Sequence, residues 1–447
     1  MAASDPVPVP GVPPTPVVPA DYLTRILEDS HARSRALVTS LAPDDLMGPQ
    51  LDIVNPPLWE VGHVTWFHEK FVLRALDSRK PWITNCDALY DSMAIQHADR
   101  WTMPLPDLGG TLEYMNAVRD ALTKRIENRE PSEVDAYLHR LTVFHADMHN
   151  EAMTYTRQTL GLAVPPFLPE FDASADPAGP LPGDIEVPGS IHRLGAEPGE
   201  GFAFDNEKWV HPVEVAPFAI SRAPVTNLEY AAFVDDGGYD EPRHWSEAGW
   251  RWRESTNSEA PVYWRYNSTG WQSRRFDHWQ PLLPHEPVMH VNWYEADAWC
   301  RWAGRRLPLE TEWEVAASRE PDGDCGLTDH RRRYPWGNAL PDRTRANLDY
   351  NFGRLLDVAA LAAGDSALGC RQMLGSVWEW TASSFAPFAD FSPDAYLEYS
   401  EPWFSEARPV LRGGAWTSCA RMLNNTHRNF FTPERRDIFA GFRTCAL

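Results

Sequence analysis

The chain has 447 residues, of which 43% are hydrophobic, enough for two or three domains that each bury an apolar core. Its 63 acidic and 41 basic residues give a formal net charge of −22, which argues against a nucleic-acid or anionic-membrane partner. The six cysteines form no CxxC pair and no run of 18 apolar residues occurs. We therefore expect a cytoplasmic protein with reduced thiols and no membrane span.

The first half of the chain alternates predicted helices with proline-rich or long connections. Residues 1–20 are rich in proline and predict a disordered or polyproline II tail. Apolar residues then recur at helical spacing over 21–41, 56–76 and 110–129. The connection 77–109 is long for a passive loop, so we expect part of it to reach a functional site, with surface exposure as the competing interpretation. Its candidate contact residues are Asp91, His97, Arg100 and Trp101.

The longest predicted helix covers residues 132–161. Ser132 and Asp135 have the spacing of a capping box at its start. Gly161 stands where a glycine commonly ends a helix.

Three histidines on the predicted helices form a candidate metal site. His145 and His149 are four residues apart, so their rings project from one helix face one turn apart. His63 shares the apolar face of the helix 56–76, whereas His68 points elsewhere. Three neutral imidazoles without a carboxylate leave coordination positions open, which suits a catalytic zinc or a non-haem iron. Taken alone, the pair His145 and His149 is equally compatible with two structural histidines.

Composition changes after residues 162–184, a segment rich in Pro, Ala and Asp that reads as a linker. Most of the 20 tryptophans follow it, among short strand-like runs and many turns. Helical patterns are confined to 226–236, 293–304 and 309–318. The region 185–447 is therefore expected to be an α+β domain with short strands and long ordered loops.

Both halves contain sequence words that resemble known families. The second half resembles the formylglycine-generating-enzyme/sulfatase-modifying family, a variant of the C-type-lectin fold, through PVTNLEYAAFV (224–234), GSVWEWTASS (375–384), LRGGAW (411–416) and GFRTC (441–445). The first half resembles the DinB-like bundle, whose members carry a three-histidine metal site, through GHVTWFHEKFVLR (62–74) and HADMHNE (145–151). The resemblance implies a multidomain α and α+β protein, with a DinB-like four-helix bundle over 21–161 and a C-type-lectin-like domain over 185–447.

The combination of the two halves resembles the ergothioneine-pathway sulfoxide synthases. These are non-haem iron enzymes that use O2 to join a chalcogen to the imidazole of hercynine, which is Nα-trimethylhistidine. The resemblance implies Fe(2+) held by His63, His145 and His149. It also implies that Glu69 and Glu151 are carboxylates that support the ligands or the fold.

The resemblance further implies substrate contacts on the C-terminal stretches. Trp416 and Phe430 are expected beside the trimethylammonium group, which cannot donate hydrogen bonds and is attracted to aromatic faces. Asn429 is expected to bind the hercynine carboxylate. Core packing for the tryptophan and a turn for the asparagine are the competing interpretations. The expected substrate-binding residues are Asp91, His97, Arg100, Trp101, Met148, Trp416, Thr417, Arg428, Asn429 and Phe430.

Departures from the two families narrow the expected chemistry. Cys419 has no second cysteine five residues later, so a two-thiolate copper site is not expected. The catalytic tyrosine of the sulfoxide synthases should follow the WEWT word, but the nearest aromatic is Phe385. The candidate catalytic residues are therefore Phe385, Tyr396 and Tyr399.

The loop that would bind the chalcogen donor carries one arginine, Arg100, and Thr417 stands where an acidic residue is expected. A donor with two carboxylates and an amine would need more charged partners. We therefore expect the selenoneine synthase branch, in which a neutral selenosugar and hercynine react with O2. The alternatives are a hercynine sulfoxide synthase that uses cysteine or γ-glutamylcysteine, a metal-dependent thiol transferase, and a sugar-binding lectin-like protein.

Overall fold

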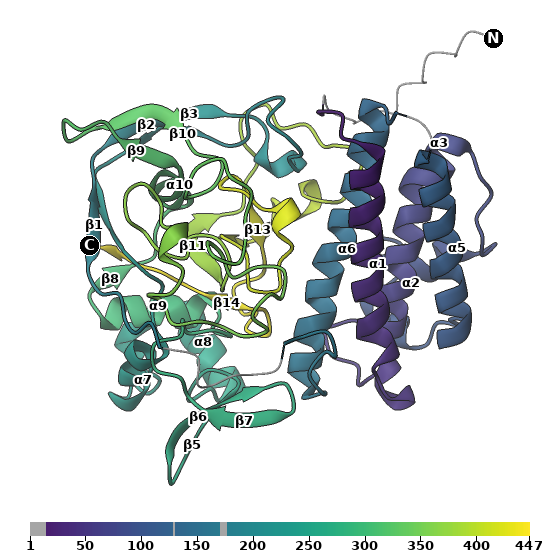
Figure 1. The fold of residues 1–447 in the computed structure, drawn as a ribbon. Helices are drawn as coiled ribbons and strands as arrows, with labels where there is room; N and C mark the ends of the chain where they lie inside the picture. The colour runs from purple at the N-terminus through teal and green to yellow at the C-terminus, as the bar shows by residue number, and fades with distance from the viewer. Residues whose placement is uncertain (1–14, 128–129, 170–176) are drawn as a thin grey trace.

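The computed structural model describes residues 15–127, 130–169 and 177–447. Figure 1 shows two parts side by side: a helical module, which ends with α6, and a mixed module of short strands and helices, residues 177–447. The helix α6 (Glu133–Leu160) is the helix of the first part that lies next to the mixed module.

Four long helices make up most of the helical module. The helix α1 packs against α5 and α6, and α2 packs against the same two helices. The predicted helical segments 21–41, 56–76, 110–129 and 132–161 all contain helix, although residues 128–129 lie outside the described part. The helices of this module are α1 (Ala20–Thr39), α2 (Pro57–His68), α3 (Ala75–Asp77), α4 (Cys86–Tyr90), α5 (Leu108–Ile126) and α6 (Glu133–Leu160).

The segment after α2 differs from the single α-helix expected over 56–76. A π-helical turn, Glu69–Arg74, joins α2 to α3, and Ser78 in the left-handed conformation ends the helix. Glu69 points inward from this turn and accepts hydrogen bonds from the Tyr114 hydroxyl at 2.6 Å and the Trp82 amide at 2.6 Å. The carboxylate expected near the histidines therefore ties the loop after α3 to α5.

The capping signals of α6 are present in the structure. Ser132 and Asp135 form the reciprocal capping box, and Gly161 ends the helix at φ +67°. The helix is buried on both sides because its outer face carries contacts to the mixed module. Asp147 pairs with Arg421 at 2.7 Å, and Glu151 accepts a hydrogen bond from the Trp378 indole at 2.7 Å.

The mixed module contains four helices and several small sheets in its described residues. The helix α8 was not expected, because a half-exposed segment in which Gly249 is the buried residue has no apolar stripe to detect. The helices are α7 (Asn227–Asp235), α8 (Glu247–Thr256), α9 (Trp293–Trp302) and α10 (Glu310–Ser318).

The strands are short, as expected from the sequence. One sheet has the order β1-β4-β15-β8 and another the order β13-β12-β11-β14, in which only the β11–β14 pair is parallel. The strands are β1 (Asp184–Val187), β2 (Ser190–Leu194), β3 (His211–Val215), β4 (Phe218–Ser221), β5 (Trp264–Asn267), β6 (Gly270–Arg275), β7 (His278–Pro281), β8 (Arg305–Arg306), β9 (Arg319–Pro321), β10 (Leu327–Arg331), β11 (Trp378–Ser384), β12 (Pro409–Arg412), β13 (Asn429–Phe430), β14 (Ala440–Gly441) and β15 (Cys445–Ala446).

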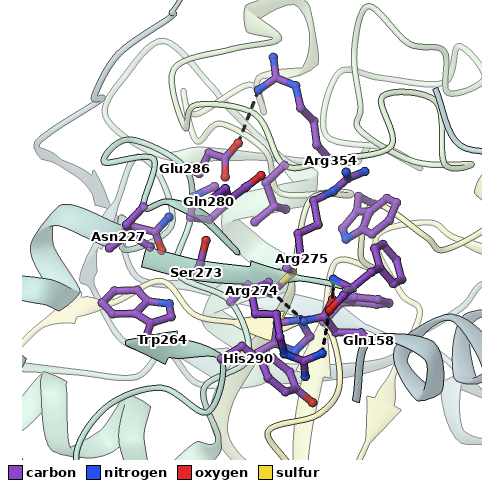
Figure 2. A pocket seen from close by; sticks show the side chains of 18 residues that line it. Gln158, Asn227, Trp264, Ser273, Arg274, Arg275, Gln280, Glu286, His290 and Arg354 are labelled. Carbon is purple, nitrogen blue, oxygen red and sulfur yellow. Dashed lines mark hydrogen bonds and ion pairs between the residues drawn. The ribbon is translucent and has the colours of Figure 1, made fainter. Parts of the chain in front are cut away.

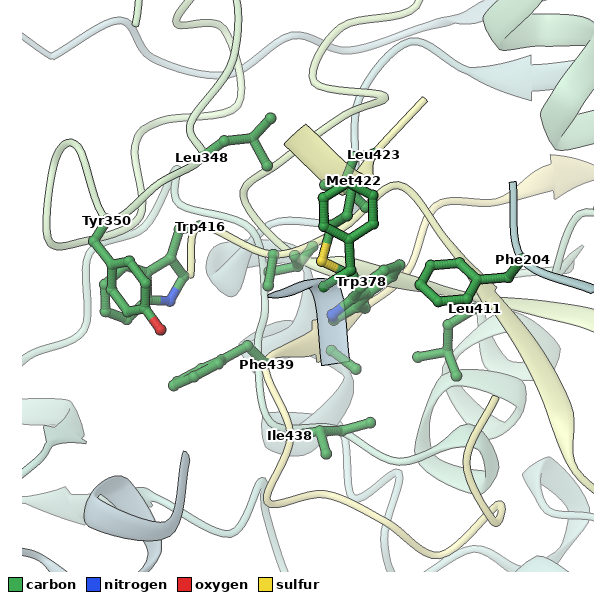
Figure 3. Packing of buried hydrophobic residues seen from close by; sticks show 14 of the residues in the cluster. Phe204, Leu348, Tyr350, Trp378, Leu411, Trp416, Met422, Leu423, Ile438 and Phe439 are labelled. Carbon is green, nitrogen blue, oxygen red and sulfur yellow. The ribbon is translucent and has the colours of Figure 1, made fainter. Parts of the chain in front are cut away.

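One hydrophobic cluster runs through both modules. It includes Leu138 and Leu141 of α6 together with Trp378, Trp416 and Phe439 of the mixed module. Figure 3 shows the part contributed by the mixed module, where aromatic rings from distant stretches gather. The two modules therefore share a core.

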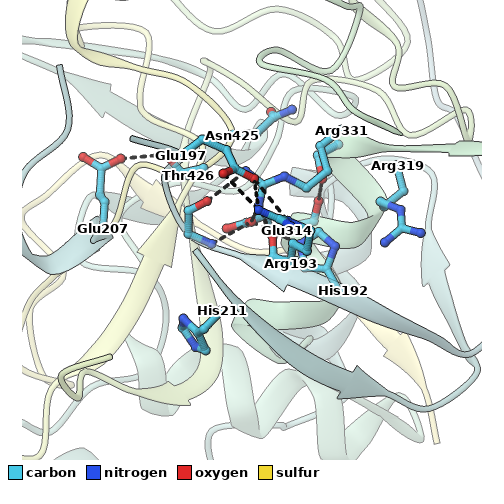
Figure 4. Close-up of polar contacts among 12 residues, drawn as sticks. His192, Arg193, Glu197, Glu207, His211, Glu314, Arg319, Arg331, Asn425 and Thr426 are labelled. Carbon is cyan, nitrogen blue, oxygen red and sulfur yellow. Dashed lines mark hydrogen bonds and ion pairs between the residues drawn. The ribbon is translucent and has the colours of Figure 1, made fainter. Parts of the chain in front are cut away.

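A network of buried, paired charges centres on Glu314 in the mixed module. Glu314 on α10 accepts hydrogen bonds from Arg412 at 2.6 Å and from His192 at 3.1 Å, and all three side chains are buried. Figure 4 shows Glu314 and His192 within this group of polar contacts. Arg412 also pairs with Glu310 at 3.1 Å. These contacts join β2, α10 and β12, which are far apart in the sequence.

The predicted tail and linker lie partly outside the described residues, namely at 1–14 and 170–176. Thr15 is buried, and the Pro16 carbonyl accepts a hydrogen bond from Arg140 at 2.8 Å. Among the described residues, no helix is long and apolar enough to cross a bilayer.

Candidate metal centre

The structure brings His63, His145 and His149 together between α2 and α6. One nitrogen from each ring lies within 4.8 Å of the others, and these three residues are the group of potential metal ligands found in the described part of the chain. The Nε2 atoms of His145 and His149 are 3.2 Å apart. The spacing expected from the sequence thus produces a convergent three-nitrogen cluster.

Two of the rings are oriented by hydrogen bonds from their other nitrogen. Nδ1 of His63 donates to the carbonyl oxygen of Tyr90 at 2.7 Å, and Nδ1 of His149 donates to Oε1 of Glu60 at 2.7 Å. These contacts leave the Nε2 lone pairs free to face the cluster. The ring of His145 is held instead by stacking on Phe67, with 3.7 Å between centroids.

Burial keeps the imidazoles of His63 and His145 in the neutral form that binds metals. Burial and the neighbouring His149 ring lower the pKa of His63 and of His145 well below the ordinary value. Two Nε2 atoms at 3.2 Å with lone pairs facing each other require a proton or a cation between them. Three imidazole nitrogens with no carboxylate in the cluster fit a metal that keeps open coordination positions.

Two of the three candidate catalytic residues approach the cluster. The ring of Tyr396 meets the His145 ring edge-on at 5.9 Å, and the Tyr399 hydroxyl points to the Met148 sulfur at 3.7 Å. Phe385 packs instead on Phe430, at 3.9 Å between centroids. Burial raises the pKa of both tyrosines, so each phenol keeps its proton at neutral pH. Their catalytic role stays a prediction.

Three candidate residues of the 77–109 connection, His97, Arg100 and Trp101, contact residues in the segment just before α2, whereas Asp91 lies beside the turn that follows α2. Arg100 stacks on Trp59 at 4.3 Å, and Trp59 in turn stacks on His63 at 4.9 Å. Arg100 also donates to Asn55 at 2.6 Å. The other three make protein contacts, with Asp91 on Lys70, His97 on the Val54 carbonyl and Trp101 on the Gly48 carbonyl.

Two of the expected C-terminal substrate residues have structural partners. Arg428 is buried and donates to Glu310 at 2.7 Å and to the Asn206 carbonyl at 2.8 Å. The guanidinium of Arg428 is thus engaged by the protein, and its substrate-binding role stays a prediction. The side-chain oxygen of Asn429 accepts a hydrogen bond from the Phe430 amide at 2.8 Å, which is the turn-like contact of the competing interpretation.

Trp416 and Thr417 are both buried, and Trp416 lines a pocket of the mixed module. This pocket has about 650 Å³ of space and lies between β6 and the C-terminal end of α6, where Gln158 and His290 face it (Figure 2). None of the three clustered histidines belongs to its described lining. Trp416, which was expected beside the substrate, thus lines a cavity that does not contain the histidine cluster.

Sequence reasoning missed two groups that orient the ligands. Glu60 lies three residues before His63 on α2, but its carboxylate binds His149 on α6. The Tyr90 carbonyl comes from the short helix α4, which no pattern indicated. The sequence did contain one signal for Glu60: its i,i+3 spacing from His63, which places both side chains on the same face of α2.

Comparisons with known proteins agree with the two-module architecture. Residues 170–446 match the sulfatase-modifying factor enzyme 1-like domain, and residues 10–160 match the DinB superfamily. The chain is 38% identical over 436 residues to the hercynine oxygenase of Mycolicibacterium thermoresistibile, and the aligned region covers 94% of each protein. It is also 38% identical to the hercynine oxygenase of Mycobacterium tuberculosis, over 93% of this chain and 96% of that protein.

The chain belongs to the hercynine oxygenase family. The formylglycine-generating enzyme of Streptomyces coelicolor, at 32% identity, covers only 59% of this chain and 88% of its own length. The long match to the hercynine oxygenases therefore includes the helical module with the histidine cluster. Cys419 is a buried free thiol whose pKa is raised by burial.

Proposed function

We propose that this protein is a non-haem iron(II), O2-dependent synthase that joins the selenium of a selenosugar to the imidazole of hercynine. The observation that carries the proposal is the convergence of one ring nitrogen from each of His63, His145 and His149 in a member of the hercynine oxygenase family. The new bond replaces an imidazole C–H and a selenol Se–H, and O2 accepts the two electrons and two protons that are released.

His63, His145 and His149 would hold the iron, which when bound would supply the redox chemistry with O2. Glu60 and the Tyr90 carbonyl fix the two ring orientations that this requires. The buried phenols of Tyr396 and Tyr399 each hold a proton beside the cluster.

The selenosugar is favoured over an anionic donor by the state of Arg100. This arginine is the cation of the donor loop expected from the sequence, and its guanidinium is stacked on Trp59 and bonded to Asn55. A guanidinium already engaged by the protein is poorly placed to bind the two carboxylates of γ-glutamylcysteine. A neutral donor does not need such a cation.

A donor competition tests the proposal. Iron-loaded protein is given hercynine, O2 and equal concentrations of the selenosugar, γ-glutamylcysteine and cysteine, and products are identified by mass spectrometry. We expect a hercynine adduct with the selenium isotope pattern. An adduct that contains sulfur alone would retain the metal site but identify the protein as a hercynine sulfoxide synthase. Turnover without O2 would favour a thiol transferase and would overturn the oxygenase proposal.

A further inference from the structure

A small cavity lies inside the helical module, separate from the histidine cluster. All four long helices contribute to its lining. The volume open to the centre of a water-sized molecule is about 20 Å³, slightly more than one such molecule needs, so the occupant must be small. The apolar lining residues are Leu27, Val64, Met115, Val118, Leu122 and Ala146.

Apart from Arg119 in the outer wall, whose guanidinium pairs with Asp120, the polar side chains that line the cavity are uncharged. The hydroxyls of Ser34 and Thr65 are bonded to protein oxygens, at 2.7 Å to Asn150 and 2.9 Å to the Val61 carbonyl. Burial lowers the pKa of His31 to about 4 and that of His68 to about 3, so both imidazoles are neutral at physiological pH. A cavity of this kind stays dry and binds apolar molecules or gases.

The inner wall of the cavity is formed by the helices that carry the metal-ligand candidates. Val64 follows His63 directly on α2, and Ala146 follows His145 directly on α6. His68, near the C-terminal end of α2, also lines the cavity. The cavity therefore lies against the back of the histidine cluster, inside the helical module.

The outer wall reaches a groove on the surface between α1 and α5. His31 and Arg119 line both the cavity and this groove. Arg119 pairs on the exposed side with Asp120 at 2.6 Å. Movement of these two half-buried side chains would connect solvent with the cavity.

We propose that this cavity is a binding site for molecular oxygen, which enters from the α1–α5 groove past His31 and Arg119 and reaches the histidine cluster from inside the helical module. The inference rests on the O2 use in the proposed function. It assigns O2 an entrance that is separate from the route of the polar substrates, which cannot enter an apolar cavity of this size.

Xenon, an apolar gas used as a stand-in for O2, tests the cavity without any turnover. We expect one xenon site between Val64, Val118 and Ala146 in crystals of the full chain under pressure. In Val118→Phe, which fills the cavity from α5, that site should be lost. Wild-type crystals without xenon in this cavity would overturn the proposal.

Kinetics test the route. In Val118→Phe we expect the KM for O2 to rise at least fivefold, with kcat at saturating O2 and the KM for hercynine unchanged. Val118→Leu, a milder change that keeps the proposal testable if the phenylalanine variant does not fold, should raise the KM for O2 by a smaller factor. The matched control is Val38→Phe, because Val38 is buried in α1 outside the cavity lining. This variant should leave the KM for O2 unchanged.

The two proposals fail in distinguishable ways. Loss of the xenon site with an unchanged KM for O2 would overturn the oxygen route and leave the synthase standing. A protein that binds xenon but consumes no O2 with hercynine and any donor would overturn the proposed function, and the route with it.

Discussion

The histidine cluster and the Glu314 network both lie in the interior and both consist of groups that can carry charge, but their polar atoms have different partners. In the network, Glu314 is met by Arg412 and His192 at hydrogen-bond distance. In the cluster, the Nε2 atoms of the histidines face one another rather than a protein partner of opposite charge. Buried polar groups that are paired with other protein groups stabilise the fold, whereas polar groups that converge without a protein partner are available to bind a ligand.

The two sites also differ in sequence range. The cluster comes from two helices, and two of its members are four residues apart. The network joins residues that are 98 and 122 positions apart. Helical spacing could reveal the first from the sequence, while only the folded structure reveals the second.

The largest expected effect separates ligand binding from folding. His145→Ala should abolish iron binding and turnover while the protein remains folded, because two imidazoles cannot replace three ligands. Metal content by mass spectrometry and the circular dichroism spectrum measure the two properties. His139→Ala on the same helix is the control and should retain the metal. A His145→Ala protein that still binds one equivalent of iron would contradict the claim that the three histidines form the metal site.

The next effect concerns the closed network. Burial alone would raise the pKa of Glu314, but the hydrogen bond from His192 and the charge of Arg412 lower it to about 2. Its ionised form is therefore favoured in the fold, and the resulting stability is present above about pH 4.5 and is lost as the pH falls toward 2. Glu314→Gln should lower the free energy of unfolding at pH 7 by about 3–5 kcal/mol, the typical cost of breaking a buried pair.

Denaturant unfolding at pH 7 and pH 3 measures this loss, which should shrink at the lower pH. Glu197→Gln is the control, because Glu197 pairs with Arg193 at the surface and such pairs contribute at most about 1 kcal/mol. Equal losses in the two variants would contradict the distinction between a closed network and a surface pair.

Glu286 sharpens the comparison because it is buried but incompletely paired. Its ion pair with Arg354 is 3.6 Å long, and burial raises its pKa to about 8 despite that arginine (Figure 2). The folded protein therefore keeps a proton that the unfolded chain releases, so stability is lost as the pH rises from about 4.5 to 8. Glu286→Gln should remove this loss, which is on the order of 1.4 kcal/mol per pH unit and a few kcal/mol in total.

Chemical unfolding at pH 5 and pH 9 tests the sign. Glu286→Gln should gain stability relative to the wild type at pH 9, and Glu259→Gln, an exposed position, should show no such gain. A wild type that becomes more stable over the same range, relative to Glu286→Gln, would show that the carboxylate is ionised in the fold.

The smallest effect concerns the support of a single ligand. Glu60→Ala removes the acceptor for Nδ1 of His149, and loss of such a partner typically weakens metal binding 10- to 100-fold, or about 1.4–2.7 kcal/mol. Glu60→Gln retains an acceptor oxygen and should recover part of the affinity. Iron titration of both variants measures this, and identical affinities would mean that the carboxylate does not act through the ring.

The sequence was informative where local rules decide the structure. The capping box of Ser132 and Asp135 and the stop at Gly161 set the ends of α6, and the helical period set the faces of His63, His145 and His149. The π-helical turn after α2 was not predictable, because its residues also satisfy an α-helical pattern. This turn directs the Glu69 carboxylate toward the Tyr114 hydroxyl on α5 and the Trp82 amide in the loop after α3.

Functional side chains on loops were harder to place for a different reason. The resemblance implied a substrate contact for Arg428, but its partner Glu310 lies 118 residues away and no local pattern encodes that contact. The same holds for the pairing of Glu60 with His149, which depends on how α2 meets α6. Long-range pairing decides whether a charged residue is free to bind a substrate.

The two-sided burial of α6 has a consequence for how the molecule comes apart. The helix contributes Leu138 and Leu141 to the shared core and presents Asp147 and Glu151 to the mixed module. Neither module can expose its side of α6 without disturbing the other, so both should melt in a single calorimetric transition. For the same reason, a protease cut in the connection between α6 and β1 should yield two fragments that migrate together on a sizing column.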